Sequence, residues 1–337
     1  MKEYLLKEIA NVKNGYAFDS SKYSDKGIPI IRIADIKDNI DLSKCVCIDE
    51  EINKEFLIKK GSLLIALSGA TTGKMSVFSD NKIAYLNQRI CSIYTKNEDI
   101  SQEFLIYFLK SIQKKIIVNS YGGAQPNISS KWIENIKIKV PNIKIQKKIS
   151  KKLELLANNI NSRKSQLVFL KELTKSLFTT MFGDIKTNDK NWEIYYWKDV
   201  LNIKNGKNQK QVEDINGKYP IYGSGGIIGR SNAYICNENS IIIGRKGNIN
   251  KPILVKEKFW NVDTAFGLEV KSEKMSYHYL YYFCLFYDFE IHNKAVTIPS
   301  LVKSDLEKIV LPVPPIELQN KFAERVEKIE KLSFNLY

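Results

Sequence analysis

The chain has 337 residues, 44% of them hydrophobic, and a formal net charge of +15. This length is enough for two domains with ordinary cores, and the lack of an apolar run of about 18 residues excludes a membrane-spanning helix. The first residues, MKEYLLKEIANVKNG, carry charges where a secretory signal needs an apolar core, so we expect a cytoplasmic protein. The excess of positive charge suits a polyanionic partner, although a coding bias toward Lys, Ile and Asn explains it equally well.

Cysteine and histidine are too sparse to predict a metal site. Neither the cysteines nor the two histidines, His278 and His292, have zinc-like spacing. The odd, scattered set of cysteines indicates reduced thiols that pack in the core of a protein from a reducing compartment. We therefore expect no metal and no cofactor. The cysteines are Cys45, Cys47, Cys91, Cys236 and Cys284.

The first third of the chain alternates apolar strands with a helix. Runs of β-branched and aromatic residues predict strands at 28–36, 62–67 and 82–94, and the apolar spacing of 100–116 predicts a helix. A loop that contains Gly and Pro, a short strand and a second helix follow. This order predicts a compact α+β domain.

The stretch 66–76, ALSGATTGKMS, is close to a phosphate-binding loop. However, only Ala70, Thr71 and Thr72 separate the two glycines, and Met75 stands where the hydroxyl residue should follow Lys74. The loop would lack one amide, and no side chain would hold magnesium. We interpret the stretch as two strands joined by a tight turn in which Gly69 adopts a positive φ.

A long heptad pattern fills residues 146–182. Apolar residues alternate at spacings of four and three, with Arg163 and Thr174 as polar interruptions, and no proline or glycine occurs before Gly183. The pattern predicts one helix of about 55 Å whose narrow apolar stripe needs a partner. The predicted seam consists of Ile149, Leu153, Leu156, Ile160, Leu167, Leu170 and Leu177.

The remaining sequence repeats these parts in the same order. The segment PNISSKWIENIKIKVPNIKIQKKISKKLELL aligns without a gap with PSLVKSDLEKIVLPVPPIELQNKFAERVEKI, and LKEIANVKNG aligns with WKDVLNIKNG. Gly247 stands opposite Gly69. Strands are predicted at 219–223, 240–245 and 259–270, and a helix at 276–291.

The last helix repeats the heptad register through Phe322, Val326 and Ile329, but it is about half as long as the helix at 146–182. We expect the two helices to pair antiparallel within one chain, with the two domains at opposite ends of this spacer. Two alternatives are that each helix packs on its own domain, or that the longer one drives dimerisation.

Two α+β domains, each followed by a helix in the same register, resemble the specificity subunit of a type I restriction-modification enzyme. The resemblance covers the whole chain, and the carboxyl-terminal helix departs from it by lacking a counterpart of 165–183. The similar segments are GIPIIRIADI, KKGSLLIALSGATTGK and YLNQRICSIY in the first copy, and YPIYGSGGIIGRSNAY, SIIIGRKGNINKPILV and FWNVDTAFGLEV in the second.

The resemblance implies two similar target recognition domains with mixed β-sheets, separated by an antiparallel coiled coil in a pseudo-twofold arrangement. Each domain would read half of a split site in double-stranded DNA. The helices would dock two methyltransferase subunits, restriction and motor subunits would join them, and the chain itself would be non-catalytic. The implied parts are recognition domains at 1–142 and 191–313 and spacer helices at 143–183 and 314–337.

Catalytic motifs do not contradict this role. The only Pro-Pro pair, Pro314-Pro315, is typical of a helix start rather than of a methyltransferase tetrapeptide, and the glycines of 223–229 miss the dinucleotide spacing. Asp263, Glu269 and Lys271 are close to a nuclease pattern but lack its preceding proline.

Side chains suited to base edges identify the candidate DNA contacts. Arg and Lys pair with guanine, and Asn and Gln pair with adenine. Most protein–DNA hydrogen bonds go to the backbone, so phosphate contact is the expected role of the lysines. The candidates are Lys74, Asn87, Gln88, Arg89, Tyr121 and Gln125 in the first copy, and Tyr222, Ser224, Arg230, Arg245, Lys246, Asn248 and Lys294 in the second.

Three other functions fit parts of the pattern. The chain could be the DNA-recognition subunit of another restriction-modification system, similar to types IIB and IIG. It could be an enzyme that binds a nucleotide through Gly69–Lys74. It could also be a scaffold that binds only proteins.

Overall fold

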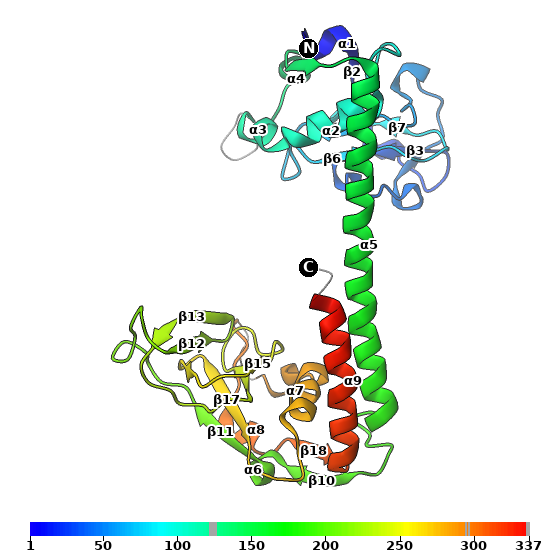
Figure 1. The fold of residues 1–337 in the computed structure, drawn as a ribbon. Helices are drawn as coiled ribbons and strands as arrows, with labels where there is room; N and C mark the ends of the chain where they lie inside the picture. Colours follow the sequence, from blue (N-terminus) through cyan, green and yellow to red (C-terminus); the bar gives the residue numbers. More distant parts are fainter. Residues whose placement is uncertain (121–126, 294, 296, 335–337) are drawn as a thin grey trace. The chain divides into compact units, whose positions relative to one another are not determined.

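The computed structural model describes residues 1–120, 127–293, 295 and 297–334 (Figure 1). The chain divides into two compact units, Met1–Asn161 and Ser162–Tyr337, and each unit has its own hydrophobic core. Helix α5 (Ile143–Phe182) contributes residues to both units.

The first unit alternates short strands with short helices, as expected of an α+β domain. Its main helix begins where Ser101 accepts a hydrogen bond from the backbone N–H of Phe104 (3.3 Å). Its elements are β1 (Lys2–Leu5), α1 (Leu6–Ile9), β2 (Ala10–Asn14), η1 (Ser20–Lys22), β3 (Ile28–Ile31), η2 (Ile33–Asp35), η3 (Leu42–Lys44), β4 (Cys47–Ile48), η4 (Lys54–Phe56), β5 (Leu63–Ala66), β6 (Met75–Val77), β7 (Tyr85–Leu86), β8 (Ile90–Thr95), α2 (Gln102–Ser111), α3 (Gln113–Val118), α4 (Ser130–Glu134) and β9 (Lys137–Val140).

The strands of the first unit form an antiparallel sheet with the order β2-β8-β5-β6. Strand β5 is buried along its whole length because every residue in LLIA is apolar and both faces are covered. A smaller sheet, β4-β3-β7, contains a parallel pair in which Ile30 lies opposite Tyr85. Strand β1 pairs with β9 and joins the beginning of the unit to its end.

The second unit has the same kinds of elements in the same order. They are β10 (Glu193–Tyr196), α6 (Trp197–Val200), β11 (Leu201–Asn205), β12 (Tyr219–Gly223), β13 (Gly226–Ser231), β14 (Ser240–Gly244), β15 (Ile253–Val255), β16 (Trp260–Asn261), β17 (Ala265–Val270), α7 (Tyr277–Phe286), η5 (Phe289–His292), α8 (Lys303–Leu306), β18 (Val310–Val313) and α9 (Ile316–Phe334).

The predicted duplication is confirmed by the strand pairing. The sheet β11-β17-β14-β15 repeats the order of β2-β8-β5-β6, and β10 pairs with β18 as β1 pairs with β9. The parallel pair recurs as well, with Ile221 opposite Trp260. The two copies therefore share one topology although their loops differ in sequence and length.

Each unit fixes the start of its long helix through a buried glutamine. In the first unit, Gln146 accepts a hydrogen bond from the N–H of Ser101 (2.8 Å) and donates to the carbonyls of Asp99 and Pro141 (both 2.9 Å). Gln319 makes the matching bonds in the second unit. It accepts from the N–H of Ser276 (2.8 Å) and donates to the carbonyls of Lys274 (2.9 Å) and Pro314 (2.7 Å).

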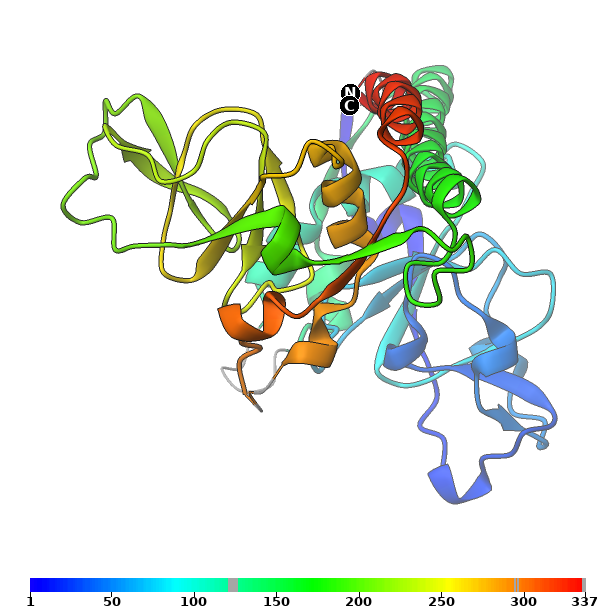
Figure 2. The ribbon, with the colours of Figure 1, turned by 90° about the horizontal axis from the view of Figure 1, so that it is seen from below.

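Within the second unit, α9 lies beside the carboxyl-terminal part of α5 (Figures 1 and 2). The ring of Phe322 lies 5.5 Å from that of Phe178 and 5.1 Å from that of Phe182, and Arg325 donates to the sulfur of Met181 (3.8 Å). The helices have 40 and 19 residues, respectively, so α9 can accompany only part of α5. Burial of these aromatic rings holds the two helices together.

Candidate nucleic-acid interface

Three loops of the second unit meet at one rim. They are the β12–β13 turn, the loop after β14 and the loop between β16 and β17. The N–H of Val262 donates to the carbonyl of Tyr222 (2.9 Å), and the N–H of Arg245 donates to that of Thr264 (2.8 Å). A methyl group placed on Gly225 would lie 3.5 Å from Nδ2 of Asn248, so the hairpin turn also approaches the β14 loop.

The β14 loop is held from its other side as well. The N–H of Gly247 donates to the carbonyl of Pro299 (3.0 Å), and the N–H of Leu301 donates to that of Arg245 (2.9 Å). Gly247 has a φ of +80°, as predicted for a glycine in a tight turn. The loop is therefore a fixed support for the side chains of Lys246 and Asn248.

The first unit builds an equivalent rim. The N–H of Leu67 donates to the carbonyl of Arg89 (2.8 Å), and the N–H of Ile128 donates to that of Leu67 (2.8 Å). These bonds match those of Arg245 in the second unit, and Gly69 has the same φ of +80° as Gly247. The N–H of Asn87 donates to the carbonyl of Ile31 (3.1 Å), which brings the loop after β3 to the same rim.

The Gly69–Lys74 loop is a closed turn and not a phosphate cradle. The N–H of Thr72 donates to the carbonyl of Gly69 (3.0 Å), that of Gly73 to Ala66 (2.8 Å) and that of Lys74 to Thr71 (2.9 Å). These amides are therefore not available to a phosphate. Strand β6 follows, where a phosphate loop would begin a helix.

The structure places the predicted DNA contacts at different depths. Asn87 is buried, and its Oδ1 accepts from the N–H of Arg89 (3.3 Å), so it shapes the turn. Arg230 donates from Nε to the carbonyl of Gly217 (2.6 Å) and from Nη2 to that of Lys218 (2.8 Å), which ties its guanidinium to the protein. Exposed on the rims or beside them are Lys74, Gln88, Arg89, Lys246 and Asn248, and partly buried there are Tyr222, Ser224 and Arg245; Tyr121, Gln125 and Lys294 lie outside the described residues.

Rim residues that the sequence did not identify as DNA contacts are Ile33, Asp263 and Thr264; Asp263 was noted only for its nuclease-like spacing. Ile33 covers Gly69, where a methyl group would lie 3.5 Å from its Cδ1. The shared bonding makes Thr264 the counterpart of Arg89, and Asp263 therefore corresponds to Gln88. An alignment of the two copies extended through this loop would have found both residues.

Aromatic rings pack against Tyr222 and Arg245 on the rim of the second unit. The ring of Tyr222 lies 5.6 Å from that of Phe259, and the guanidinium of Arg245 lies 5.8 Å from the ring of Phe266. Burial raises the pKa of Tyr222, and the charge of Glu257 adds to this effect. The hydroxyl of Tyr222 therefore keeps its proton at neutral pH and can donate a hydrogen bond.

The nuclease-like residues do not converge. Glu269 forms an ion pair with Lys204 (2.8 Å), and Asp263 precedes β17 while Glu269 lies near its far end. The turn that contains Asp263 lies before β17, and the extended residues from Ala265 to Glu269 span about 13 Å, too far for the two carboxylates to share a metal ion. Residues 1–120, 127–293, 295 and 297–334 contain no group of three or more metal-ligating side chains.

The cysteines and histidines serve packing. All five cysteines are buried and unpaired with one another, and burial raises the pKa of Cys91 and of Cys236 to about 12. Burial also lowers the pKa of His278, although Glu327 at 3.8 Å acts in the opposite direction. His292 accepts or donates one hydrogen bond with the hydroxyl of Tyr287 (2.8 Å). The cysteines at least are not poised as nucleophiles.

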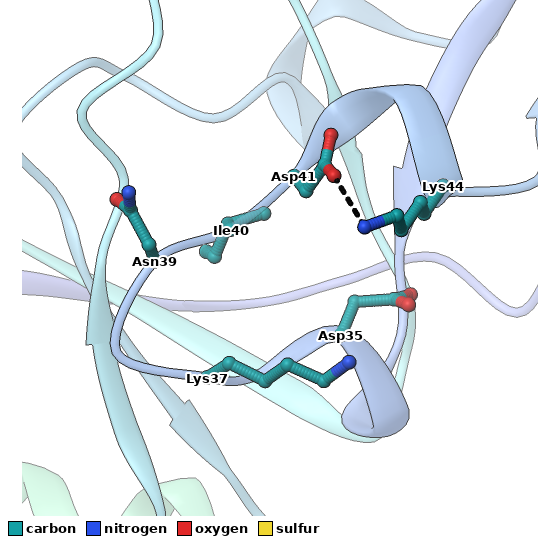
Figure 3. Close-up of a pocket in the computed structure, with 6 residues that line it drawn as sticks. All are labelled: Asp35, Lys37, Asn39, Ile40, Asp41 and Lys44. Carbon is teal, nitrogen blue, oxygen red and sulfur yellow. Dashed lines mark ion pairs between the residues drawn. The ribbon is translucent and has the colours of Figure 1, made fainter. Parts of the chain in front are cut away.

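A hollow in the first unit, shown in Figure 3, is lined by acidic and basic side chains, of which Asp41 and Lys44 form an ion pair with each other. Lys44 lies 3.0 Å from the carboxylate of Asp41, which also accepts hydrogen bonds from Ser43. These bonds from Ser43, together with Lys44, hold the pKa of Asp41 below its usual value. An ionised carboxylate that caps a turn is a structural group rather than a general acid. The hollow is lined by Asp35, Lys37, Asn39, Ile40, Asp41 and Lys44.

The predicted helix seam is only partly buried. Leu177, Phe322 and Val326 contribute to the core of the second unit, whereas Leu156 is 57% and Ile160 54% exposed. The core also includes Phe178, one position after the predicted seam residue Leu177, and Phe182. Of the remaining positions, Leu167, Leu170 and Ile329 are partly buried, and Ile149 and Leu153 are exposed.

In the described part of the chain, none of the helices combines the length and the apolarity that crossing a membrane requires.

Comparison with known proteins gives a consistent result. A family described as "Type I restriction modification DNA specificity domain" matches residues 1–169 and again residues 189–336. The specificity subunit of the type I restriction enzyme MjaVIII from Methanocaldococcus jannaschii is 24% identical over 327 residues, which cover 83% of this chain and 75% of that protein. The putative MjaX specificity subunit of the same organism is 23% identical over 368 residues, with 97% and 86% covered.

Solved structures share the fold. The crystal structure of the S subunit of a type I restriction-modification system from M. genitalium superposes with a TM-score of 0.65 at 17% identity, covering 99% of this chain and 92% of that one. A chain from a structural study of complex assembly in the type I restriction-modification system gives a TM-score of 0.56 at 14% identity, covering 99% and 91%.

Proposed function

The chain belongs to the family of type I restriction-modification DNA specificity domains, and we propose that each of its two units reads one half of a bipartite double-stranded DNA target. Recognition of DNA sequence within a type I restriction-modification system is the function of this family, so the alternatives of a type IIB- or IIG-like subunit and of a nucleotide-binding enzyme are not favoured. The finer assignment rests on one observation. A single backbone frame occurs twice and presents different side chains on its rim.

The side chains on each rim suit the major groove. Gln88 and Arg89 of the first unit can form paired hydrogen bonds with adenine and guanine, respectively. Asn248 of the second unit suits adenine, and the exposed Lys74 and Lys246 suit phosphates. Because the loops are fixed by backbone hydrogen bonds, the side chains need little ordering on binding, which favours specific recognition.

The chain supplies recognition, and its partners supply chemistry. Exposed apolar residues on α5, including Leu156, Ile160 and Phe169, offer a surface to the two methyltransferase subunits, and the restriction subunits join that core. The recognition domains are 1–142 and 191–313, with the segments 143–183 and 314–337, which contain α5 and α9, as the spacer between the half-sites. The compartment is the cytoplasm, where such a complex meets DNA.

The decisive experiment is methylome sequencing of a host with and without this chain. We expect one split methylation motif to disappear with the chain. Exchange of residues 1–142 for those of another family member should change one half of the motif and leave the other half intact. A change in both halves, or in neither, would refute the assignment of one half-site to each unit.

Electrostatic attraction should dominate the affinity of the assembled complex for DNA. With a net charge of +15 on this chain, binding to duplex DNA should weaken steeply as salt rises, with a linear dependence of log affinity on log salt. A titration by fluorescence anisotropy at several salt concentrations measures the slope. A slope near zero would contradict the phosphate contacts assigned to the rim lysines.

A further inference from the structure

The β12–β13 hairpin contains an irregularity that changes the direction of two apolar side chains. Ile221 pairs with Gly229, but the next residue, Tyr222, pairs with Ile227, so Ile228 is an extra residue on β13. Such a β-bulge disrupts strict alternation and can re-aim side chains. As a result, Ile227 and Ile228 are both exposed, by 61% and 54%, although they are adjacent on one strand.

The fold does not need these two side chains. The small core beneath the hairpin is formed by residues such as Cys236, Ile242 and Phe259, and Ile227 and Ile228 are not part of it. They lie on β13, which is the edge strand of the sheet β13-β12-β16. An exposed apolar pair at a strand edge invites aggregation and is normally avoided. A function that uses them explains their retention better than packing does.

In the first unit, the corresponding stretch between β3 and β4, residues 32–46, contains no adjacent pair of exposed apolar side chains. After β3 its chain enters η2, and Ile33 there is packed over Gly69 instead of being exposed. The exposed isoleucines at this hairpin are therefore present in the second unit and not at the corresponding place in the first. A side chain that determines which DNA sequence is preferred should differ between the two units in this way.

The isoleucines adjoin the second rim. A methyl group on Gly223 would lie 3.7 Å from Cγ2 of Ile228 and 3.8 Å from Cγ2 of Val262, which belongs to the β16–β17 loop. The turn, Ser224-Gly225, and the first residue of β13, Gly226, carry little side chain, so the backbone here can approach another surface closely. Arg245 and Lys246 on the adjoining loop supply positive charge that suits a DNA backbone.

We propose that Ile227 and Ile228 contact the C5-methyl group of thymine in the major groove, within the half-site that the second unit reads. A two-stranded β-ribbon fits the major groove, and the thymine methyl is the apolar group that base pairs present there. The contact distinguishes thymine from cytosine by burial of a methyl group. This inference rests on the proposed function, because it assigns a base to one of the proposed half-sites.

Uracil tests the contact because it differs from thymine only by this methyl group. Once the motif is known, each thymine of both half-sites is replaced in turn by uracil, and the affinity of the complex with its methyltransferase subunits is measured. We expect about fourfold weaker binding for a contacted thymine in the second half-site, the effect of one buried methyl-sized group. This measurement uses the unaltered chain and does not depend on the folding of a variant.

Two variants of the chain, measured with the same thymine and uracil DNAs, show whether the isoleucines make the contact. The double variant Ile227→Ser/Ile228→Ser should bind thymine-containing DNA more weakly and should no longer respond to uracil in the second half-site. Its response to the first half-site should equal that of the unaltered chain. The matched control is Ile194→Ser, since Ile194 is 54% exposed but lies on β10 in a different sheet, and it should keep the full uracil response.

Three results would overturn the inference. They are a second half-site without thymine, an unaltered chain whose affinity ignores uracil there, and a double variant that still responds to uracil. Insertion of the isoleucines as a wedge from the minor groove would give the second result together with bending of the DNA. Failure of the proposed function is distinguishable, because no bipartite motif would then be found at all.

Discussion

Replacement of Gln319 by leucine should detach α9 from the domain that it follows. Gln319 is fully buried, and its amide makes three hydrogen bonds, to Ser276, Lys274 and Pro314. Leucine has a similar size but leaves one backbone N–H and two carbonyls without these partners. Each buried group that loses its hydrogen bond costs about 1 to 3 kcal/mol, and a group that can bond to water instead costs less. For the three groups together, we expect the free energy of unfolding to fall by about 3 to 5 kcal/mol.

The same substitution in the other unit provides a reciprocal control. Gln146 makes the matching three bonds in the first unit, so Gln146→Leu should have a similar cost there. Hydrogen exchange followed by mass spectrometry reports each unit separately. Gln319→Leu should speed exchange in α7 and α9 and spare α2, whereas Gln146→Leu should do the reverse.

Gln211 gives a baseline because its side chain is exposed. Gln211→Leu should change stability by less than about 0.5 kcal/mol. A loss below about 1 kcal/mol for Gln319→Leu, or faster exchange in both units from either buried substitution, would refute the reasoning that these hydrogen bonds fix each helix to its own domain.

Three further predictions concern the helix surface, the rim and the thiols. Leu156→Asp should release the methyltransferase subunits in a pull-down without unfolding the chain. The control Asn159→Asp adds the same charge at an exposed position and should retain them. If both variants retain the subunits, Leu156 is not part of the docking surface. Gly206→Ala would place its methyl group 1.8 Å from the carbonyl oxygen of Val262, so it should lower the free energy of unfolding, measured by chemical denaturation, by at least about 2 kcal/mol. Gly225→Ala, whose methyl group would have its nearest atom at 3.5 Å, should be nearly neutral. Equal effects of the two variants would contradict the close approach of Gly206 to Val262. The five buried cysteines should resist an aromatic disulfide reagent at pH 8 in the native state and react fully in denaturant, since burial raises the pKa of Cys91 and Cys236 to about 12; rapid native labelling would contradict their burial.

Arg230 and Asn87 show the limit of inference from residue type. Both have side chains suited to bases; Asn87 directly follows β7, and Arg230 lies on β13. In the structure, however, the guanidinium of Arg230 holds the carbonyls of Gly217 and Lys218, and Asn87 is buried against its own turn. Their hydrogen-bond partners are backbone groups that only the fold brings close. The sequence therefore identifies a polar side chain but does not show whether that side chain already bonds to the protein.

The exposed isoleucines and the aromatic helix contact illustrate the same point for apolar groups. Alternation along β13 predicts one inward and one outward residue, and only the paired register reveals the bulge at Ile228. The heptad pattern predicts Leu177 as a seam residue, but packing against Phe322 also takes Phe178 from the neighbouring position. A strict heptad drifts relative to a straight helix, so the buried face shifts along it.

The sequence by itself determined the features that depend on neighbouring residues. These are the order of strands and helices, the unbroken run of α5, the duplication, and the glycine turns at Gly69 and Gly247 with their positive φ. Local periodicity and backbone sterics set the elements and the glycine turns, and the duplication follows from comparing the two halves of the sequence. The tertiary structure alone decided which loops meet at a rim and which polar groups on it remain available, because those outcomes depend on hydrogen bonds between residues that are distant in the chain.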